Sequence, residues 1–131
     1  MAPDFLSVAD VCAIHSDQIS RYGGTNGLRS VELLEGAVAA PQATLGGAFL
    51  HDGPAEMAAA YLWHLVQDHP FVDGNNRTGL AVALVFQVLN GVDVVAPEEA
   101  LEGVVWAVAR GEADREQVAQ FLRQHARSPD P

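Results

Sequence analysis

Residues 69–79 read His-Pro-Phe-Val-Asp-Gly-Asn-Asn-Arg-Thr-Gly and run directly into residues 80–89, where Gln87 is the only polar side chain. A helix without polar positions has no face suited to solvent and is normally surrounded by other elements. We therefore expect residues 80–89 to form a buried central helix, with the turn-rich segment 69–79 at its amino-terminal end.

Helical periodicity continues on both sides of this segment. Apolar residues recur at spacings of three and four over 8–22, preceded by Ser7 as a helix cap. Further helices are expected from near Ser30 to just before Pro41, over 55–68, from Pro97 to about Arg110, and from a capping box of Asp114 and Gln117 onward. About six helices with almost no strand predict an all-α fold, a single domain over residues 1–131, that is roughly two-thirds helical.

Residues 41–54 interrupt the helical pattern. They contain two prolines, three glycines and the apolar residues Leu45, Phe49 and Leu50, with no helical period. We expect a loop or small hairpin that acts as a flap beside a functional site. Residues 128–131, Ser-Pro-Asp-Pro, are expected to form a loose tail.

The composition limits the class of protein. Of 131 residues, 49% are hydrophobic and 18% charged, which is enough apolar material for a core and argues against disorder. Seven arginines and no lysine stand against 17 acidic residues, and this net charge of −10 makes nucleic acid an unsuitable partner. The acidic stretch 92–116 is either a solvated helix surface or a docking face for a basic partner.

The single cysteine and the apolar runs bear on location. Cys12 has no partner for an internal disulfide, which leaves the redox compartment open, with a reducing cytoplasm as the default. No leader pattern precedes Asp10, and the apolar run 80–89 is too short to span a bilayer. We expect a cytoplasmic protein without a membrane anchor.

Residues 69–79 combine groups that suit phosphate chemistry. The N–H groups at a helix start attract anions, and Gly74 with the asparagines after it lets the backbone turn toward one. The helix dipole disfavours Arg77 in the first turn, so an anionic ligand would stabilise it there. Asp73 suits Mg²⁺ that is also bound by phosphates, and His69 can take a proton from a hydroxyl near neutral pH. A plain turn with a helix cap and a packing histidine explains the same residues equally well.

Other histidines carry weaker signals. His64, Asp68 and His69 could together bind a metal ion, but no further ligand stands at a suitable spacing. We interpret the remaining three histidines as surface or packing residues: His15, His51 and His125.

The segment from His69 to Arg77 resembles the signature HPFx(D/E)GNGR of the Fic and Doc superfamily, an all-α fold whose members transfer part of a nucleotide to protein hydroxyls. Three further stretches are similar to the Doc, or death-on-curing, toxins: Ile19-Ser-Arg-Tyr-Gly-Gly24, Asn90-Gly91 after the apolar helix, and Gly111-Glu112 before the last helix. The resemblance covers essentially residues 5–125.

The resemblance implies roles for individual residues. His69 would be the catalytic base that activates a target hydroxyl, Asp73 the catalytic carboxylate and Mg²⁺ ligand, and Arg77 a catalytic contact to the outer phosphates. The groups that would bind the nucleotide phosphates are those of Gly74, Asn75, Asn76 and Arg77. The implied cofactors are ATP and Mg²⁺, the implied target is elongation factor Tu docked at the flap 41–54, and the implied partner is a Phd-like antitoxin.

Two positions depart from the family pattern. Leu80 stands where Fic adenylyltransferases carry a second arginine, which favours the Doc branch. Asn76 matches neither the lysine usual in Doc proteins nor the glycine of Fic enzymes, and it supplies no charge. The sequence thus predicts a Doc-like kinase that moves the γ-phosphate of ATP to a Ser or Thr hydroxyl of a translation factor. It leaves open an adenylyltransferase, or a catalytically silent module that binds nucleotide or antitoxin.

Overall fold

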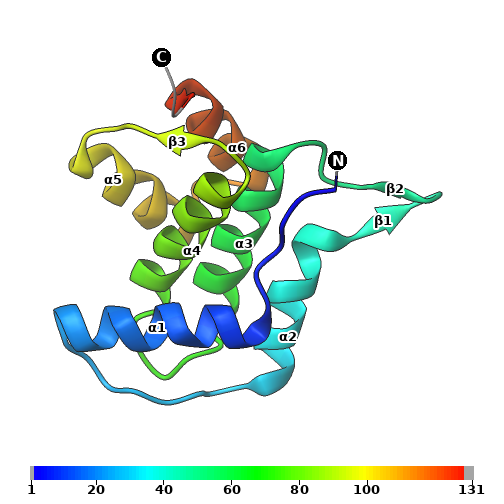
Figure 1. Cartoon of the computed structure of the whole chain (residues 1–131). Helices are drawn as coiled ribbons and strands as arrows, with labels where there is room; N and C mark the ends of the chain where they lie inside the picture. The colour runs from blue at the N-terminus through cyan, green and yellow to red at the C-terminus, as the bar shows by residue number, and fades with distance from the viewer. Residues whose placement is uncertain (1, 129–131) are drawn as a thin grey trace.

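The computed structural model describes residues 2–128, within which the chain forms six α-helices, one 3-10 turn and two small antiparallel strand pairs (Figure 1). In chain order these elements are α1 (Val8–Tyr22), α2 (Val31–Ala39), η1 (Ala40–Gln42), β1 (Thr44–Leu45), β2 (Ala48–Phe49), α3 (Pro54–Asp68), α4 (Asn75–Leu89), β3 (Asp93–Val94), α5 (Glu98–Ala109), α6 (Arg115–Gln124) and β4 (Ala126–Arg127). The predicted mostly helical class is confirmed.

The helix at the centre of the fold is α3 rather than α4. Side chains all around α3 are buried, including the run Ala58–Ala60, and the helix packs against α2, α4, α5 and α6. In α4 the side chains of Val85, Val88 and Leu89 are 40%, 60% and 48% exposed. The expectation that residues 80–89 lack a solvent face is therefore wrong.

Side-chain size explains why α3 takes the central place. The small alanines of α3 let neighbouring helices approach from several directions, whereas apolar composition alone does not determine which face of α4 becomes covered. α3 and α4 lie side by side in Figure 1. They are so close at Gly79 that a Cβ there would lie 2.9 Å from Cγ2 of Val66 and 3.3 Å from the carbonyl oxygen of Leu62.

Helix starts follow the predicted caps. The Ser7 side chain accepts a hydrogen bond from the backbone N–H of Asp10, and the Asp10 carboxylate accepts one from the Ser7 N–H, which completes a capping box for α1. Asp114 and Gln117 form the expected capping box of α6. Pro97, which was expected as the first residue of a helix, instead lies just outside α5 as its cap, and the helix begins at Glu98.

The predicted flap is a hairpin. After the turn η1, the strands β1 and β2 pair antiparallel and project away from the helices (Figure 1). Leu45 is 75% exposed at the tip, whereas the ring of Phe49 lies 5.6 Å from that of Phe5 in the amino-terminal segment. The hairpin is thus anchored at its base and presents apolar side chains at its end. Phe49 and His51 line a hollow with Leu89 and Asn90 at the carboxyl end of α4, whereas residues 69–79 lie at the amino-terminal end of that helix. The expectation that the flap lies beside these residues is therefore wrong.

A second strand pair was not anticipated. β3 and β4 join the connection between α4 and α5 to the segment after α6. Of the predicted tail 128–131, only Ser128 falls within the described residues, and the rest of that prediction lies outside them. No helix in the described part of the chain combines the length and apolar character needed to cross a membrane.

Candidate active site

The segment between α3 and α4 lies against the loop that leaves α1, and α1 itself crosses the ends of both helices (Figure 1). The two loops are joined by three backbone hydrogen bonds of 2.7 to 3.0 Å, from the N–H groups of Arg29 and Ser30 to the carbonyl of Pro70 and from Val72 to the carbonyl of Gly27. This pairing fixes the backbone on which all the predicted site residues stand.

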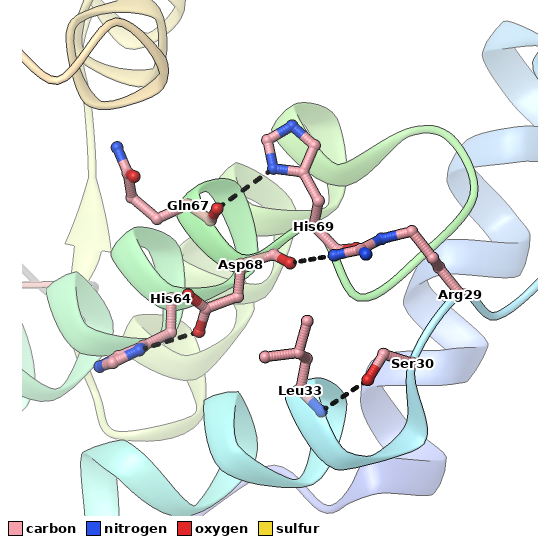
Figure 2. Close-up of polar contacts among 7 residues, drawn as sticks. All are labelled: Arg29, Ser30, Leu33, His64, Gln67, Asp68 and His69. Carbon is pink, nitrogen blue, oxygen red and sulfur yellow. Dashed lines mark hydrogen bonds and ion pairs between the residues drawn. The ribbon is translucent and has the colours of Figure 1, made fainter.

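His69 directly follows α3 and is exposed. Its φ of 51° and ψ of 57° place it in the left-handed region, and it is the one non-glycine residue with positive φ among those described. Nδ1 of its ring lies 3.3 Å from the carbonyl oxygen of Gln67 (Figure 2). Because a carbonyl only accepts, Nδ1 carries the proton and the lone pair of the neutral ring is on Nε2. His69 therefore presents a base at Nε2.

Arg29 holds the backbone under this histidine, and sequence reasoning missed it. Its Nε donates to the carbonyl of His69 and its Nη2 to the carbonyl of Asp68, both at 2.6 Å (Figure 2). The guanidinium thus occupies the carboxyl end of α3, where the helix dipole favours a positive charge. Nothing in the local sequence around Arg29 indicates this contact.

Asp73 is exposed near the start of α4 and is held by backbone donors. The N–H of Thr25 donates to Oδ2 at 3.1 Å, and the N–H of Gly74 donates to Oδ1 at 2.8 Å. These two bonds, with smaller contributions from the charges of Arg77 and His15, lower the pKa of the Asp73 carboxyl below its ordinary value. Each oxygen keeps a lone pair for a further ligand.

His15 in α1 supports the same loop from within the core. It is 2% exposed, its Nε2 donates to the backbone carbonyl of Asp73 at 2.8 Å, and its ring stacks on Phe71 with centroids 3.8 Å apart. His15 lies on the buried face of α1, where apolar residues recur at spacings of three and four. The interpretation of His15 as an ordinary surface or packing residue was incomplete, because its ring also donates a hydrogen bond to the backbone of Asp73.

Asn75 braces the loop with its side chain. Its Oδ1 accepts from the N–H of Phe71 and its Nδ2 donates to the Phe71 carbonyl, each at 3.0 Å, and the side chain is buried. The side chain of Asn75 therefore points away from any bound phosphate, and only its backbone N–H is available as an anion donor.

The first turn of α4 provides several backbone N–H groups that can bind an anion. Gly74 takes φ 78° and no side chain caps the helix. Within the described residues, the backbone N–H groups of Asn75, Asn76 and Arg77 have no acceptor. Such a helix start binds anions well.

Arg77 contacts α1 rather than depending on a ligand. Its Nη2 donates to the carbonyl of Gly23 at 2.7 Å, a longer contact of 3.5 Å reaches the carbonyl of Gln18, and the guanidinium lies 5.7 Å from the centre of the Tyr22 ring. These carbonyls form the negative end of the α1 dipole, which compensates for the unfavourable start of α4. An anionic ligand is not required to explain Arg77.

Comparison with known proteins shows the family of the chain. A family model described as Fic/DOC family matches residues 5–87, which span α1 through most of α4 and include the whole segment from His69 to Arg77. The chain belongs to the Fic/DOC family. It is 37% identical over 103 residues to "Toxin Doc" of Mycolicibacterium smegmatis, covering 77% of this chain and 79% of that protein. It is 36% identical over 118 residues to "Protein kinase doc" of Escherichia phage P1, covering 90% and 92% respectively.

The alternative metal site does not assemble in this Fic/DOC chain. Nδ1 of His64 lies 3.2 Å from Oδ2 of Asp68, but the ring of His69 turns toward Gln67 instead (Figure 2). Across the described residues no group of three or more His, Cys, Asp or Glu side chains is arranged to hold a metal ion. Asp73 is therefore the one candidate ligand among the predicted site residues, and a metal there would need ligands from a substrate and from water.

Proposed function

We propose that this protein transfers the γ-phosphate of ATP to a serine or threonine hydroxyl of a translation factor, elongation factor Tu by resemblance, and acts as a Doc-like toxin. The observation that carries the proposal is the pairing of a base at Nε2 of His69 with an anion-binding helix start beside Asp73. Phosphoryl transfer needs mainly positioning and charge stabilisation, which these groups provide.

In the proposed chemical step, each of these groups has its own role. Nε2 of His69 takes the proton of the target hydroxyl as its oxygen bonds to the γ-phosphorus, and the bond from that phosphorus to ADP breaks. The backbone N–H groups of Asn75 and Asn76 bind phosphate oxygens, and Arg77 adds positive charge through the N–H groups that α1 leaves free. His69 then releases its proton to solvent.

The residues also fit Mg²⁺. Each carboxylate oxygen of Asp73 accepts a single backbone hydrogen bond, the side chain is exposed, and the low pKa keeps it ionised at neutral pH. One protein carboxylate is typical where phosphates and water complete the coordination of Mg²⁺. When bound, the ion would neutralise charge on the nucleotide phosphates.

The group transferred is the finer part of the proposal. Leu80 provides no second arginine for the phosphates, and a relative of similar length is named as a protein kinase. Both support γ-phosphoryl over adenylyl transfer. Asn76 supplies two amide donors in place of a charge, so we expect weaker phosphate binding rather than a different reaction.

The proposal is tested by incubating the protein with Mg²⁺ and a translation extract, using ATP labelled at the γ- or the α-phosphate. We expect γ-label on one protein band, its loss in His69→Ala and Asp73→Asn, and its retention in His125→Ala. His125 is a suitable control because its Nδ1 also contacts a backbone carbonyl, that of Phe121, at 2.9 Å. α-Label alone would indicate an adenylyltransferase, and nucleotide binding without His69-dependent label would indicate a silent module.

We further propose a Phd-like antitoxin as the partner. A pocket of 390 Å³ lies between α1, α4 and α5, with Leu80, Leu84 and Leu101 in its wall and the exposed Glu98 and Glu102 at α5. An uncovered apolar surface edged by carboxylates suits a segment that is both apolar and basic. Arg77 also lines this pocket, so an occupant would lie beside the catalytic loop.

Expression in a bacterial host tests the toxin and the partner together. We expect the wild-type protein to arrest growth, His69→Ala to be harmless, and a co-expressed Phd-type antitoxin to restore growth. Leu84→Glu should weaken that rescue, whereas Val95→Glu, at an exposed position that does not line the pocket, should not. Wild-type protein as harmless as His69→Ala would contradict the toxin proposal.

A further inference from the structure

We propose that Arg29 is a positioning residue for His69: its guanidinium replaces the backbone cap that α3 lacks and thereby holds the catalytic imidazole in its working direction. The inference rests on the proposed function, because it presumes that His69 is the base. It concerns a residue outside the segment 69–79, on the loop between α1 and α2.

The end of α3 cannot be closed in the usual way. A helix that ends on a left-handed residue commonly has glycine there and is closed by the N–H groups of that residue and of the following one, which donate to carbonyls in the last turn. Among the described residues, the N–H of His69 makes no such bond. Here the left-handed residue is His69, whose Cβ makes this conformation unfavourable by about 1 to 2 kcal/mol. The following residue is Pro70, which has no N–H. The left-handed turn therefore needs a donor from elsewhere.

Arg29 is that donor. Its Nε and Nη2 bind the carbonyls of His69 and Asp68 at 2.6 Å each, so one planar group ties together the last helical residue and the residue after it (Figure 2). Two charge-assisted bonds in a fixed fork define the relative orientation of two peptide planes, which a single donor cannot do.

The backbone of Arg29 is itself fixed. Its N–H donates to the carbonyl of Pro70 at 2.7 Å, and the next residue, Ser30, caps α2 by accepting from the N–H of Leu33 at 3.2 Å. The guanidinium thus connects the start of α2 to the end of α3 over a short span. The orientation of the His69 backbone, and with it the contact from Nδ1 to Gln67 that leaves Nε2 free, depends on this connection.

The test compares Arg29→Ala and Arg29→Lys with Arg21→Ala. Arg21 is a matched control, an exposed arginine whose side chain binds only Asp17 among the described residues, on the surface of α1. Displacement of a catalytic group by about 1 Å costs on the order of 100-fold in rate, so we expect a kcat loss of that size in Arg29→Ala. The KM for ATP should stay unchanged, because Arg29 does not contact the anion site. Added guanidinium should partly restore the rate, and Arg29→Lys should lie in between.

A second measurement does not depend on activity. In the isotope-labelled protein, the amide-to-Hα coupling and the Cα and Cβ chemical shifts of His69 report a left-handed backbone. We expect this signature in the wild type and in Arg21→Ala, and its loss in Arg29→Ala, with the helical circular dichroism retained. Arg29→Lys, which keeps the charge, provides the same comparison if the alanine variant unfolds.

The outcomes separate the two proposals. If the wild type transfers nothing but the His69 signature disappears in Arg29→Ala, the proposed function fails and the positioning of His69 by Arg29 stands as a structural fact. If Arg29→Ala keeps both the signature and the wild-type kcat, the positioning role is overturned whatever the reaction. A raised KM for ATP with unchanged kcat would also overturn it, because that pattern indicates phosphate binding.

Discussion

The buried ring of His15 donates from Nε2 to the backbone carbonyl of Asp73 at 2.8 Å, across 58 residues of sequence. This bond, together with the stacking of the ring on Phe71, joins α1 to the loop that leads into α4. Because it uses the carbonyl of Asp73, the carboxylate remains free to accept from Thr25 and Gly74 and to face solvent. The segment 69–79 thus takes its shape in part from a helix that supplies no proposed reacting group.

Replacement of His15 by phenylalanine separates the hydrogen bond to Asp73 from the stacking on Phe71. The variant keeps a ring on Phe71 but leaves the Asp73 carbonyl without its donor, so we expect a loss of about 1 kcal/mol in the free energy of unfolding. Transfer activity should fall further than this small loss explains, because Asp73 shifts. Urea unfolding and the label assay measure the two effects. Ser16→Ala, at an exposed position of α1, is the control, and equal behaviour of the two variants would contradict the role of His15.

Gly24 is predicted to be essential because of Asp73. A Cβ at Gly24 would lie 2.8 Å from Oδ2 of Asp73 and 3.3 Å from Nη2 of Arg77, whereas a Cβ at Gly23 would meet nothing within 4 Å. Both glycines have positive φ, 120° and 84°, so alanine is strained at either position by about 1 to 3 kcal/mol.

Comparison of Gly24→Ala with Gly23→Ala therefore separates the steric overlap with Asp73 from the backbone strain that both variants share. We expect both variants to lose stability in thermal unfolding, but only Gly24→Ala to lose Mg²⁺-dependent nucleotide binding by calorimetry. Loss of binding in both variants would show that loop strain, not contact with Asp73, is responsible.

The adjacent residues Asn75 and Asn76 are expected to differ in their contribution to the free energy of unfolding. Asn75 is buried and its side chain satisfies both backbone groups of Phe71, so Asn75→Ala leaves polar groups unpaired at a cost of about 1 to 3 kcal/mol. Asn76 is half-buried and its side chain makes no hydrogen bond with the described residues, so Asn76→Ala should cost less than about 0.5 kcal/mol. Urea unfolding of the two variants measures the difference, and an equal cost would rule out the bracing role of Asn75.

The helices could be predicted because their signals are local. Ser7, Ser30 and Asp114 each stand at a cap, and the caps and the apolar spacing depend on residues only a few positions apart. The central position of α3 could not be predicted, since it depends on how alanine-rich and valine-rich surfaces pack against one another. The pairing of β3 with β4 is similarly nonlocal, because it joins residues more than thirty positions apart.

The residues of the candidate site also divide into those that the sequence predicts and those that it does not. His69, Asp73 and Arg77 share one short segment, so their proximity followed from the sequence. Their supports come from far away: Thr25 and Arg29 lie 48 and 40 residues from the groups that they bind. The local sequence around a histidine in a helix or an arginine in a loop does not indicate such contacts. They form only when α1 and α2 pack against the segment 69–79.

His51 gives the fold a dependence on pH that is separate from the active site. Burial lowers the pKa of its imidazole from 6.5, the charges of Arg115 and His64 lower it further, and Glu56 opposes them. A histidine with a lowered pKa is protonated more readily in the unfolded chain than in the folded one. Between pH 6.5 and its folded pKa the unfolded state therefore binds more protons, and stability falls as the pH falls through this range.

His51→Gln should remove this contribution. We expect the free energy of unfolding of the wild type, measured in urea, to decline from pH 7.5 to 5 more steeply than that of the variant, with the two curves parallel above about pH 7.5, where imidazole is neutral in both states. His64→Gln is the informative companion, because it removes one of the charges that repel protonated His51 and should make the decline shallower. A steeper decline in His51→Gln than in the wild type would mean that the pKa is raised by Glu56 rather than lowered by burial.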